Sequence, residues 1–132
     1  MKLILLSSLL AVCRLAPDAD IPTWALQQRS LLSITYTDDE LSIVCPASVV
    51  PQSVRSETNW RAIKVQGPLD FSLTGILASI ATPLASANIP LFAISTFDTD
   101  YILVKEQHIE HARSILEQNG HVFEVGMQYE EQ

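Results

Sequence analysis

Two carboxylates and two threonine hydroxyls gather in residues 95–100, between the apolar runs 89–94 and 101–104. Apolar runs that flank a short polar segment predict a β-hairpin with the polar residues at its tip. Asp98 and Asp100 are two residues apart, so on a strand both would face the same side, as an acid and base pair requires. No candidate nucleophile, base histidine or glycine-rich phosphate loop accompanies them, so we predict no catalytic residues and no enzyme activity.

A second place suited to binding is the start of a predicted helix. Asp70 can accept hydrogen bonds from free backbone amides, as an N-cap does. Those amides also suit an anionic group, whereas Asp100 suits an ammonium group, so the two places together fit a zwitterionic ligand. The alternative is structural: Asp70 only caps the helix, and the hairpin tip only reverses the chain.

The histidines and the remaining acidic residues give no metal-site pattern. His108 and His111 are three apart on a predicted helix, but no third ligand is predictable beside them, so we expect both to be exposed and no metal to bind. We expect the same of His121. The acidic triplet 38–40 is expected to be a solvated turn between two strands.

Hydrophobic periodicity predicts the elements that position these residues. The pattern at 71–87 is an amphipathic helix, which Pro83 should kink or end early because proline lacks a backbone donor. A short helix at 22–27 should bury Trp24 and Leu26. The other predicted elements are strands at 3–6, 9–14, 31–37, 41–45, 59–65 and 121–125, and a helix at 106–118.

The order of these elements predicts the fold class. The second half reads strand, helix, strand, strand, helix, strand, which is typical of the ferredoxin-like α+β fold with a four-stranded antiparallel sheet and both helices on one face. The first half repeats this order with short helices. We therefore expect two ferredoxin-like units packed together: a degenerate one over 1–58, a complete one over 59–126, and an acidic tail over 127–132.

Charge excludes one class of partner. The 132 residues are 48% hydrophobic, and the net charge of −7 lies wholly in the second half: residues 67–132 hold two Lys/Arg and nine Asp/Glu. Nucleic acid binding requires basic side chains that replace counterions around phosphates, so we predict no nucleic acid partner.

The N-terminus has the outline of a lipoprotein signal, with Lys2, an apolar stretch and then Cys13. Ser7 and Ser8 interrupt the stretch, and Val12 is bulky for a cleavage site, so we favour two buried strands. No apolar run reaches the length of about 18 residues that spans a bilayer, so we predict no membrane partner.

Cys13 and Cys45 are the two cysteines, and they lack C-x-x-C spacing. We expect reduced, buried thiols in a cytoplasmic protein. A disulfide between them stays open at this point, because pairing depends on geometry that the sequence does not give.

Residues 67–77 (Gly-Pro-Leu-Asp-Phe-Ser-Leu-Thr-Gly-Ile-Leu), Pro83-Leu84 and residues 88–105, which include Ser-Thr-Phe-Asp-Thr-Asp, resemble ACT-domain proteins of the small bacterial tandem type. The same segment is similar to the ACT repeats of eukaryotic cytosolic arginine sensors. The resemblance is specific over 60–118 and looser over 1–58. ACT domains are regulatory modules that bind amino acids or similar effectors, usually between two ACT units, so the resemblance implies ligand sensing without catalysis and without a cofactor.

The resemblance also implies a ligand site. In the arginine-sensing relatives the helix start, the strand leading into the hairpin and the Ser-Thr-Phe-x-x-Asp tip hold the ligand. Asp100 would hold an α-ammonium or other cationic group. Leu73 stands where those relatives use an acidic side chain, which disfavours arginine, and Asp70 replaces a glycine. The implied site residues are Asp70, Leu73, Pro90, Leu91, Thr96, Phe97, Thr99 and Asp100.

The leading interpretation is therefore a cytoplasmic regulatory protein that binds an amino acid or similar zwitterion, forms a homodimer, and acts alone or on an enzyme or regulator in trans. The alternative is a protein–protein interaction module with an ACT-like fold and no ligand, which docks a partner through an exposed sheet edge. A third interpretation, an enzyme that uses Asp98 and Asp100, lacks the partner residues described above.

Overall fold

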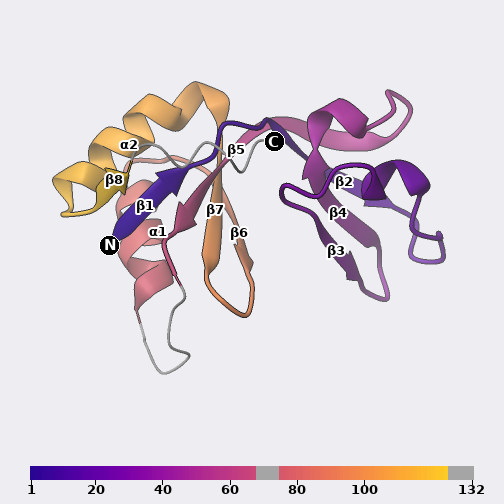
Figure 1. Cartoon of the computed structure of the whole chain (residues 1–132), viewed down its shortest axis with the longest axis horizontal. Coiled ribbons are helices and arrows are strands. Elements are labelled where there is room, and N and C mark those ends of the chain that lie inside the picture. The colour runs from indigo at the N-terminus through magenta and orange to yellow at the C-terminus, as the bar shows by residue number, and fades with distance from the viewer. Residues whose placement is uncertain (68–74, 125–132) are drawn as a thin grey trace. The chain divides into compact units, whose positions relative to one another are not determined.

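The computed structural model describes residues 1–67 and 75–124 (Figure 1). Its described residues form two compact units. The first, here called the helical unit, contains Met1–Ser7 and the described residues that follow Trp60, and the second, the strand unit, contains Ser8–Trp60. Strand β5 (Arg55–Val65) contributes to both units, and its Asn59 has a positive φ of 67° at a register shift opposite Leu10 and Val12, which marks a β-bulge.

The helical unit has the predicted α+β architecture, a mixed sheet with two helices packed on one face. The sheet order is β8-β1-β5-β7-β6, and alternate residues of its strands join the two helices in one core. Its other elements are β1 (Lys2–Leu5), α1 (Ile76–Ser86), β6 (Leu91–Ser95), β7 (Asp100–Lys105), a 3₁₀ turn (Glu106–His108), α2 (Ile109–Gln118) and β8 (Val122–Glu124).

The position of strand β1 differs from the expected division of the chain. The sequence assigned residues 1–58 to one unit, but β1 lies in the helical unit, antiparallel to β5 and parallel to β8. The sheet therefore has five strands among the described residues, where four were expected. Leu3 and Ile4 are neighbours on β1, so their side chains point to opposite faces of the sheet, and both are buried. The apolar N-terminal residues are therefore suited to a strand between two others.

Helix α1 continues through Pro83 to Ser86, so of the two outcomes expected at Pro83, a kink or an early end, the early end is wrong. Pro83 has no N–H for the carbonyl oxygen of Ser79, four residues earlier, and that carbonyl needs another donor. His121 supplies it: Nε2 lies 3.1 Å from the Ser79 oxygen. The helix tolerates proline in its last turn because a side chain from the start of β8 replaces the missing backbone hydrogen bond.

The strand unit is built from four strands in the order β3-β4-β2-β5, with only 3₁₀ turns between them. The first turn (Thr23–Leu26) buries Ala25 and leaves Leu26 41% exposed, whereas Trp24 packs against the core from a half-buried position. The expectation that Leu26 is buried is wrong, because Ala25 is the residue of this turn that enters the core. The remaining elements are β2 (Leu10–Leu15), β3 (Ser33–Tyr36), β4 (Leu41–Pro46) and a second turn (Ala47–Val49).

The two cysteines lie in the core of the strand unit, on the neighbouring strands β2 and β4. Both are free and buried, which confirms the prediction of reduced core thiols. A hydrogen bond between the thiols lowers the pKa of Cys13 and, together with burial, raises the pKa of Cys45. Neither thiol is accessible from solvent in the folded unit.

Candidate functional site

Strands β6 and β7 form the predicted hairpin (Figure 1). Ser95 lies directly opposite Asp100 in this pair of strands. Residues 96–99 make the tip. The backbone N–H of Thr96 donates to the carbonyl of Thr99 at 2.8 Å, and the Thr99 N–H donates to the Thr96 hydroxyl at 3.3 Å. The tip is therefore a closed turn whose shape is set by its own hydrogen bonds.

Thr99 joins the tip to strand β5. Its side chain is 4% exposed, and its hydroxyl donates to the carbonyl oxygen of Val65 at 2.7 Å. The pairing of β1 with β5, in which Gln66 N–H donates to Lys2, turns the Val65 carbonyl away from β1 and toward the β7 side. The Thr99 hydroxyl is thus used inside the protein, at the point where β5 ends.

The two carboxylates of the tip differ in their surroundings. Asp98 is exposed in the turn, and Asp100, half-buried at the start of β7, accepts a hydrogen bond from the Ser95 hydroxyl on Oδ1 at 2.5 Å. Among the described residues Oδ2 of Asp100 has no partner. Phe97 is 79% exposed beside these carboxylates. An aromatic ring and carboxylate oxygens are groups that attract a cation.

The other implied site residues lie elsewhere or are not described. Leu91 pairs with Val104 at the far end of the hairpin, four residues along β6 from Ser95, which is about 13 Å for a strand. Its side chain packs against the core of the helical unit, and Pro90 before it is exposed. Asp70 and Leu73 fall outside the described residues. The structure therefore groups Thr96, Phe97, Thr99 and Asp100, and the roles of all eight residues stay predictions.

A hollow of about 790 Å³ lies between α1 and the end of α2, away from the hairpin. His121 lines it and is only 6% exposed, so the expectation of an exposed histidine is wrong at this position. The signal for its burial was Pro83, whose missing N–H requires a donor elsewhere. The Ser79 atom in this contact is the carbonyl oxygen, which can only accept a hydrogen bond, so Nε2 of His121 carries the proton. The buried Nδ1 of His121 has no partner among the described residues.

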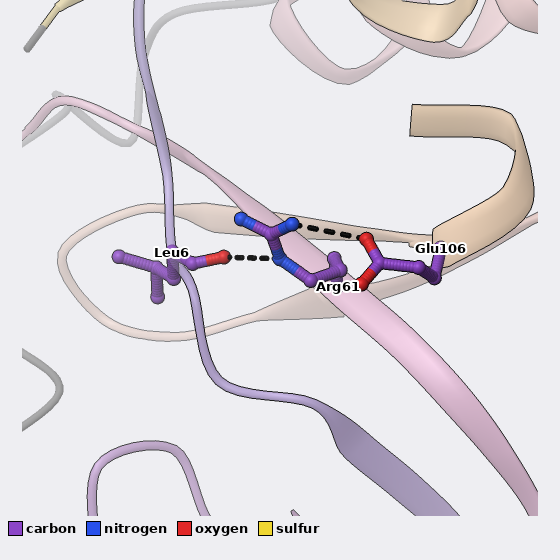
Figure 2. Close-up of polar contacts among 3 residues, drawn as sticks. All are labelled: Leu6, Arg61 and Glu106. Atoms are coloured by element: carbon purple, nitrogen blue, oxygen red, sulfur yellow. Dashed lines mark hydrogen bonds and ion pairs between the residues drawn. The ribbon is translucent and has the colours of Figure 1, made fainter. Parts of the chain in front are cut away.

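Arg61 is a further polar residue that the sequence analysis missed. Figure 2 shows its guanidinium between two segments: Nε donates to the Leu6 carbonyl at 2.9 Å and Nη1 to Glu106 Oε1 at 3.0 Å. The Arg61 side chain is 17% exposed, whereas that of Glu106 is 48% exposed. The sequence signal was an arginine between two buried residues of a strand, Trp60 and Ala62. A strand residue that faces only solvent or only the core does not need the several N–H donors of a guanidinium group.

Substitution of Arg61 by leucine is expected to destabilise the helical unit by about 1–2 kcal/mol, because the Leu6 carbonyl loses a charged donor. Substitution of Glu106 by glutamine should cost less than about 0.5 kcal/mol, since this ion pair is open to solvent. Urea denaturation of both variants measures the difference. Equal costs would contradict the assignment of the stabilisation to the Leu6 contact.

The architecture described above, two helices on one face of a mixed sheet in the ferredoxin-like order with one added strand, is that of an ACT-type α+β unit. A family model for the ACT domain matches residues 55–118, and a second model, for an N-terminal domain, matches residues 9–53. Protein Atu0741 from Agobacterium tumefaciens, of known crystal structure, is 39% identical, covers 96% of this chain and 94% of its own, and superposes with a TM-score of 0.89. The chain belongs to the ACT-domain family.

Curated relatives match over part of their length. The human cytosolic arginine sensor for mTORC1 subunit 1 is 44% identical over 59 residues, which is 44% of this chain and 18% of that protein. The mouse protein is 38% identical over 81 residues, 61% of this chain and 24% of its own. This chain therefore matches less than a quarter of the length of these relatives.

More distant structures share the fold. Aspartokinase III from E. coli, solved in complex with aspartate and ADP, is 13% identical, covers 89% of this chain and 32% of its own, and has a TM-score of 0.61. Within the described part of this chain, neither helix is long and apolar enough to cross a membrane.

Proposed function

We propose that this ACT-domain protein is a regulatory protein that binds an amino acid or similar zwitterion at the tip of the β6–β7 hairpin. The observation that carries the proposal is the half-buried Asp100, whose Oδ2 is left without a partner among the described residues while the hydroxyls around it are already used. A half-buried carboxylate with a free acceptor favours a cationic group in that place. Membership of the ACT family and the printed name of the arginine-sensing relatives support this class of ligand.

We assign each tip residue a role in this proposal. Asp100 holds the ammonium group of the ligand, and Phe97 covers it with an aromatic face. Thr96 and Thr99 fix the shape of the tip, since their hydroxyls bond within the protein. Asp70, Leu73, Pro90 and Leu91 complete the proposed site, with Leu73 disfavouring arginine as the ligand. We assign no catalytic role to any residue.

We also propose that the strand unit is a second, degenerate ACT-like unit. Its sheet order β3-β4-β2-β5 is the ferredoxin-like order, and its two 3₁₀ turns take the places of the two helices. Cytoplasmic location, a homodimer and a target enzyme or regulator in trans belong to the same proposal. The alternative, an interaction module without ligand, is favoured by the free edge of β6, which pairs only with β7 among the described residues.

A thermal-shift panel of the twenty amino acids tests the proposal. At least one amino acid at 100 times its dissociation constant should stabilise the protein by about 2.7 kcal/mol, because it binds the folded state. Asp100→Ala should abolish this shift, and the matched variant Asp98→Ala, two residues away in the exposed turn, should retain it. No shift with any amino acid would favour the interaction module, and an equal loss in both variants would count against a specific role for Asp100.

A further inference from the structure

We propose that the free edge of strand β3 binds an extended, basic segment of a partner protein, which adds one strand to the sheet of the strand unit. Strand β3 stands at the end of the order β3-β4-β2-β5 and, among the described residues, pairs only with β4. The inference concerns the strand unit alone and does not depend on the amino-acid site proposed at the β6–β7 hairpin.

The register of β3 and β4 shows which backbone groups of β3 are free. The Thr37 N–H donates to the carbonyl of the residue opposite it in the turn, at 2.9 Å, so this pair is hydrogen-bonded. Hydrogen-bonded and non-hydrogen-bonded pairs alternate along an antiparallel ladder, so Ser33 and Thr35 also bond to β4. The N–H and C=O groups of Ile34 and Tyr36 therefore point away from β4, and no strand in the described part of the chain pairs with them.

The side chain of Tyr36 adds a contact surface beside this edge. It is 49% exposed, and its hydroxyl donates to the Ala19 carbonyl at 2.6 Å. This bond holds the loop 16–20 near the end of β3, and Ile21, the next residue along the chain, is 40% exposed. A strand that pairs with β3 would thus contact an aromatic ring as well as the backbone edge, and the face of such a ring attracts a cation.

The loop 16–20 and the turn 37–40 favour a basic partner. Together they hold five Asp/Glu and no Lys/Arg. Their carboxylates have no hydrogen bond or ion pair within the described residues; the five are Asp18, Asp20, Asp38, Asp39 and Glu40. Arg14 contacts the turn through the backbone carbonyl of Asp39, at 2.9 Å, and leaves the carboxylates unpaired. Lysine or arginine side chains on a partner strand would offset the repulsion among these charges.

Charge also distinguishes such a partner from a second copy of this chain. The chain has 15 Asp/Glu against 8 Lys/Arg, so a second copy brings no excess of basic side chains to the acidic loops. Strand β3 is four residues long and ends in a charged turn, two features that keep an edge strand from pairing with every strand it meets. An extended segment that carries basic side chains meets both conditions, because it supplies a backbone edge and the complementary charge.

Two synthetic peptides with capped ends test the proposal on the whole protein: one alternates lysine and valine, the other glutamate and valine. At saturation the lysine peptide should slow hydrogen exchange of the Ile34 and Tyr36 amides about tenfold or more, because both become bonded. The Ser33 and Thr35 amides are already bonded to β4 and should change by less than about twofold. The glutamate peptide should bind at least about tenfold more weakly than the lysine peptide.

A pair of double variants tests the contribution of charge. Asp38→Asn with Asp39→Asn should weaken binding of the lysine peptide about five- to tenfold and reduce its dependence on salt. The matched control, Glu110→Gln with Glu117→Gln, removes two exposed carboxylates from α2 and should change the affinity by less than about twofold. Both variants have the same net charge, so a difference between them reports the position of the charges. Equal melting temperatures of the two free variants would exclude unfolding as its cause.

Three results would overturn the proposal. The first is an unchanged exchange rate of the Ile34 and Tyr36 amides in the presence of the lysine peptide, and the second is equal binding of the two peptides. The third is slow exchange of these amides in the free protein that becomes fast on dilution, which would mean that a second copy covers the edge. The amino-acid site can fail separately, since Asp100→Ala should leave peptide binding unchanged.

Discussion

Replacement of His121 by alanine is expected to lower the free energy of unfolding of the helical unit by about 3 kcal/mol. The side chain is 6% exposed, and its Nε2–H is the donor that replaces the missing N–H of Pro83 at the Ser79 carbonyl. The loss combines the hydrogen bond to the Ser79 carbonyl, about 1 kcal/mol, with the cavity that the ring leaves behind. Denaturation in urea, followed by a probe in the helical unit, measures it.

The partner of this substitution is Pro83→Ala, which returns an N–H to position 83. In that background the helix donates to Ser79 through its own backbone, so His121→Ala should cost at least about 1 kcal/mol less than it does with proline present. His111→Ala, an exposed histidine on α2, is the matched control and should change stability by less than about 0.5 kcal/mol. If the free-energy costs of His121→Ala and Pro83→Ala simply add in the double variant, His121 does not replace the missing N–H of Pro83.

Replacement of Thr99 by valine should destabilise the helical unit by about 2 kcal/mol, with little change in side-chain volume. The buried hydroxyl donates to the Val65 carbonyl, which the pairing of β5 with β1 turns away from the donors of β1. A buried acceptor without a donor costs about 1–3 kcal/mol. The measurement is a urea denaturation curve of the valine variant against the wild type.

Thr99→Ser is the control, because it retains the hydroxyl and removes one methyl group. It should cost about 1 kcal/mol, the transfer free energy of one buried methyl group, and leave the hairpin resonances in place. In the valine variant the amide signals of the tip should move, because its tie to β5 is lost. Equal destabilisation by serine and valine would show that packing, and not the hydroxyl, holds the tip.

The sequence predicted the elements of the helical unit well because their signals are local. Apolar residues at helical spacing predict α2, and the three residues on that face, Ile109, Ala112 and Leu116, are buried. The left-handed residues Asn88 and Gly120 lie in the turns that follow the two helices, where a helix commonly ends. The hairpin β6–β7 follows from two apolar runs around a polar turn.

What the sequence did not predict depends on contacts between distant residues. The place of β1 between β5 and β8 follows from pairing over some 60 residues with β5 and some 120 with β8, and an apolar run carries no information on its partner. His121 contacts the carbonyl that Pro83, 38 positions earlier, leaves without a backbone donor, and Arg61 bonds to both Leu6 and Glu106. The ligand residues implied by the resemblance lie at both ends of the hairpin. A sequence motif gives the order of residues along the chain but not the distance between them in the fold.

The measurement that tests the central claim most directly is an NMR titration of the full-length protein with the amino acid that gives the largest thermal shift. The proposal predicts that the amide signals of Ser95, Thr96 and Asp100 move with a single dissociation constant. It predicts that these changes disappear in Asp100→Ala and persist in Asp98→Ala. Shifts confined to the strand unit or to the hollow beside His121, or shifts unchanged by Asp100→Ala, would contradict an amino-acid site at the hairpin tip.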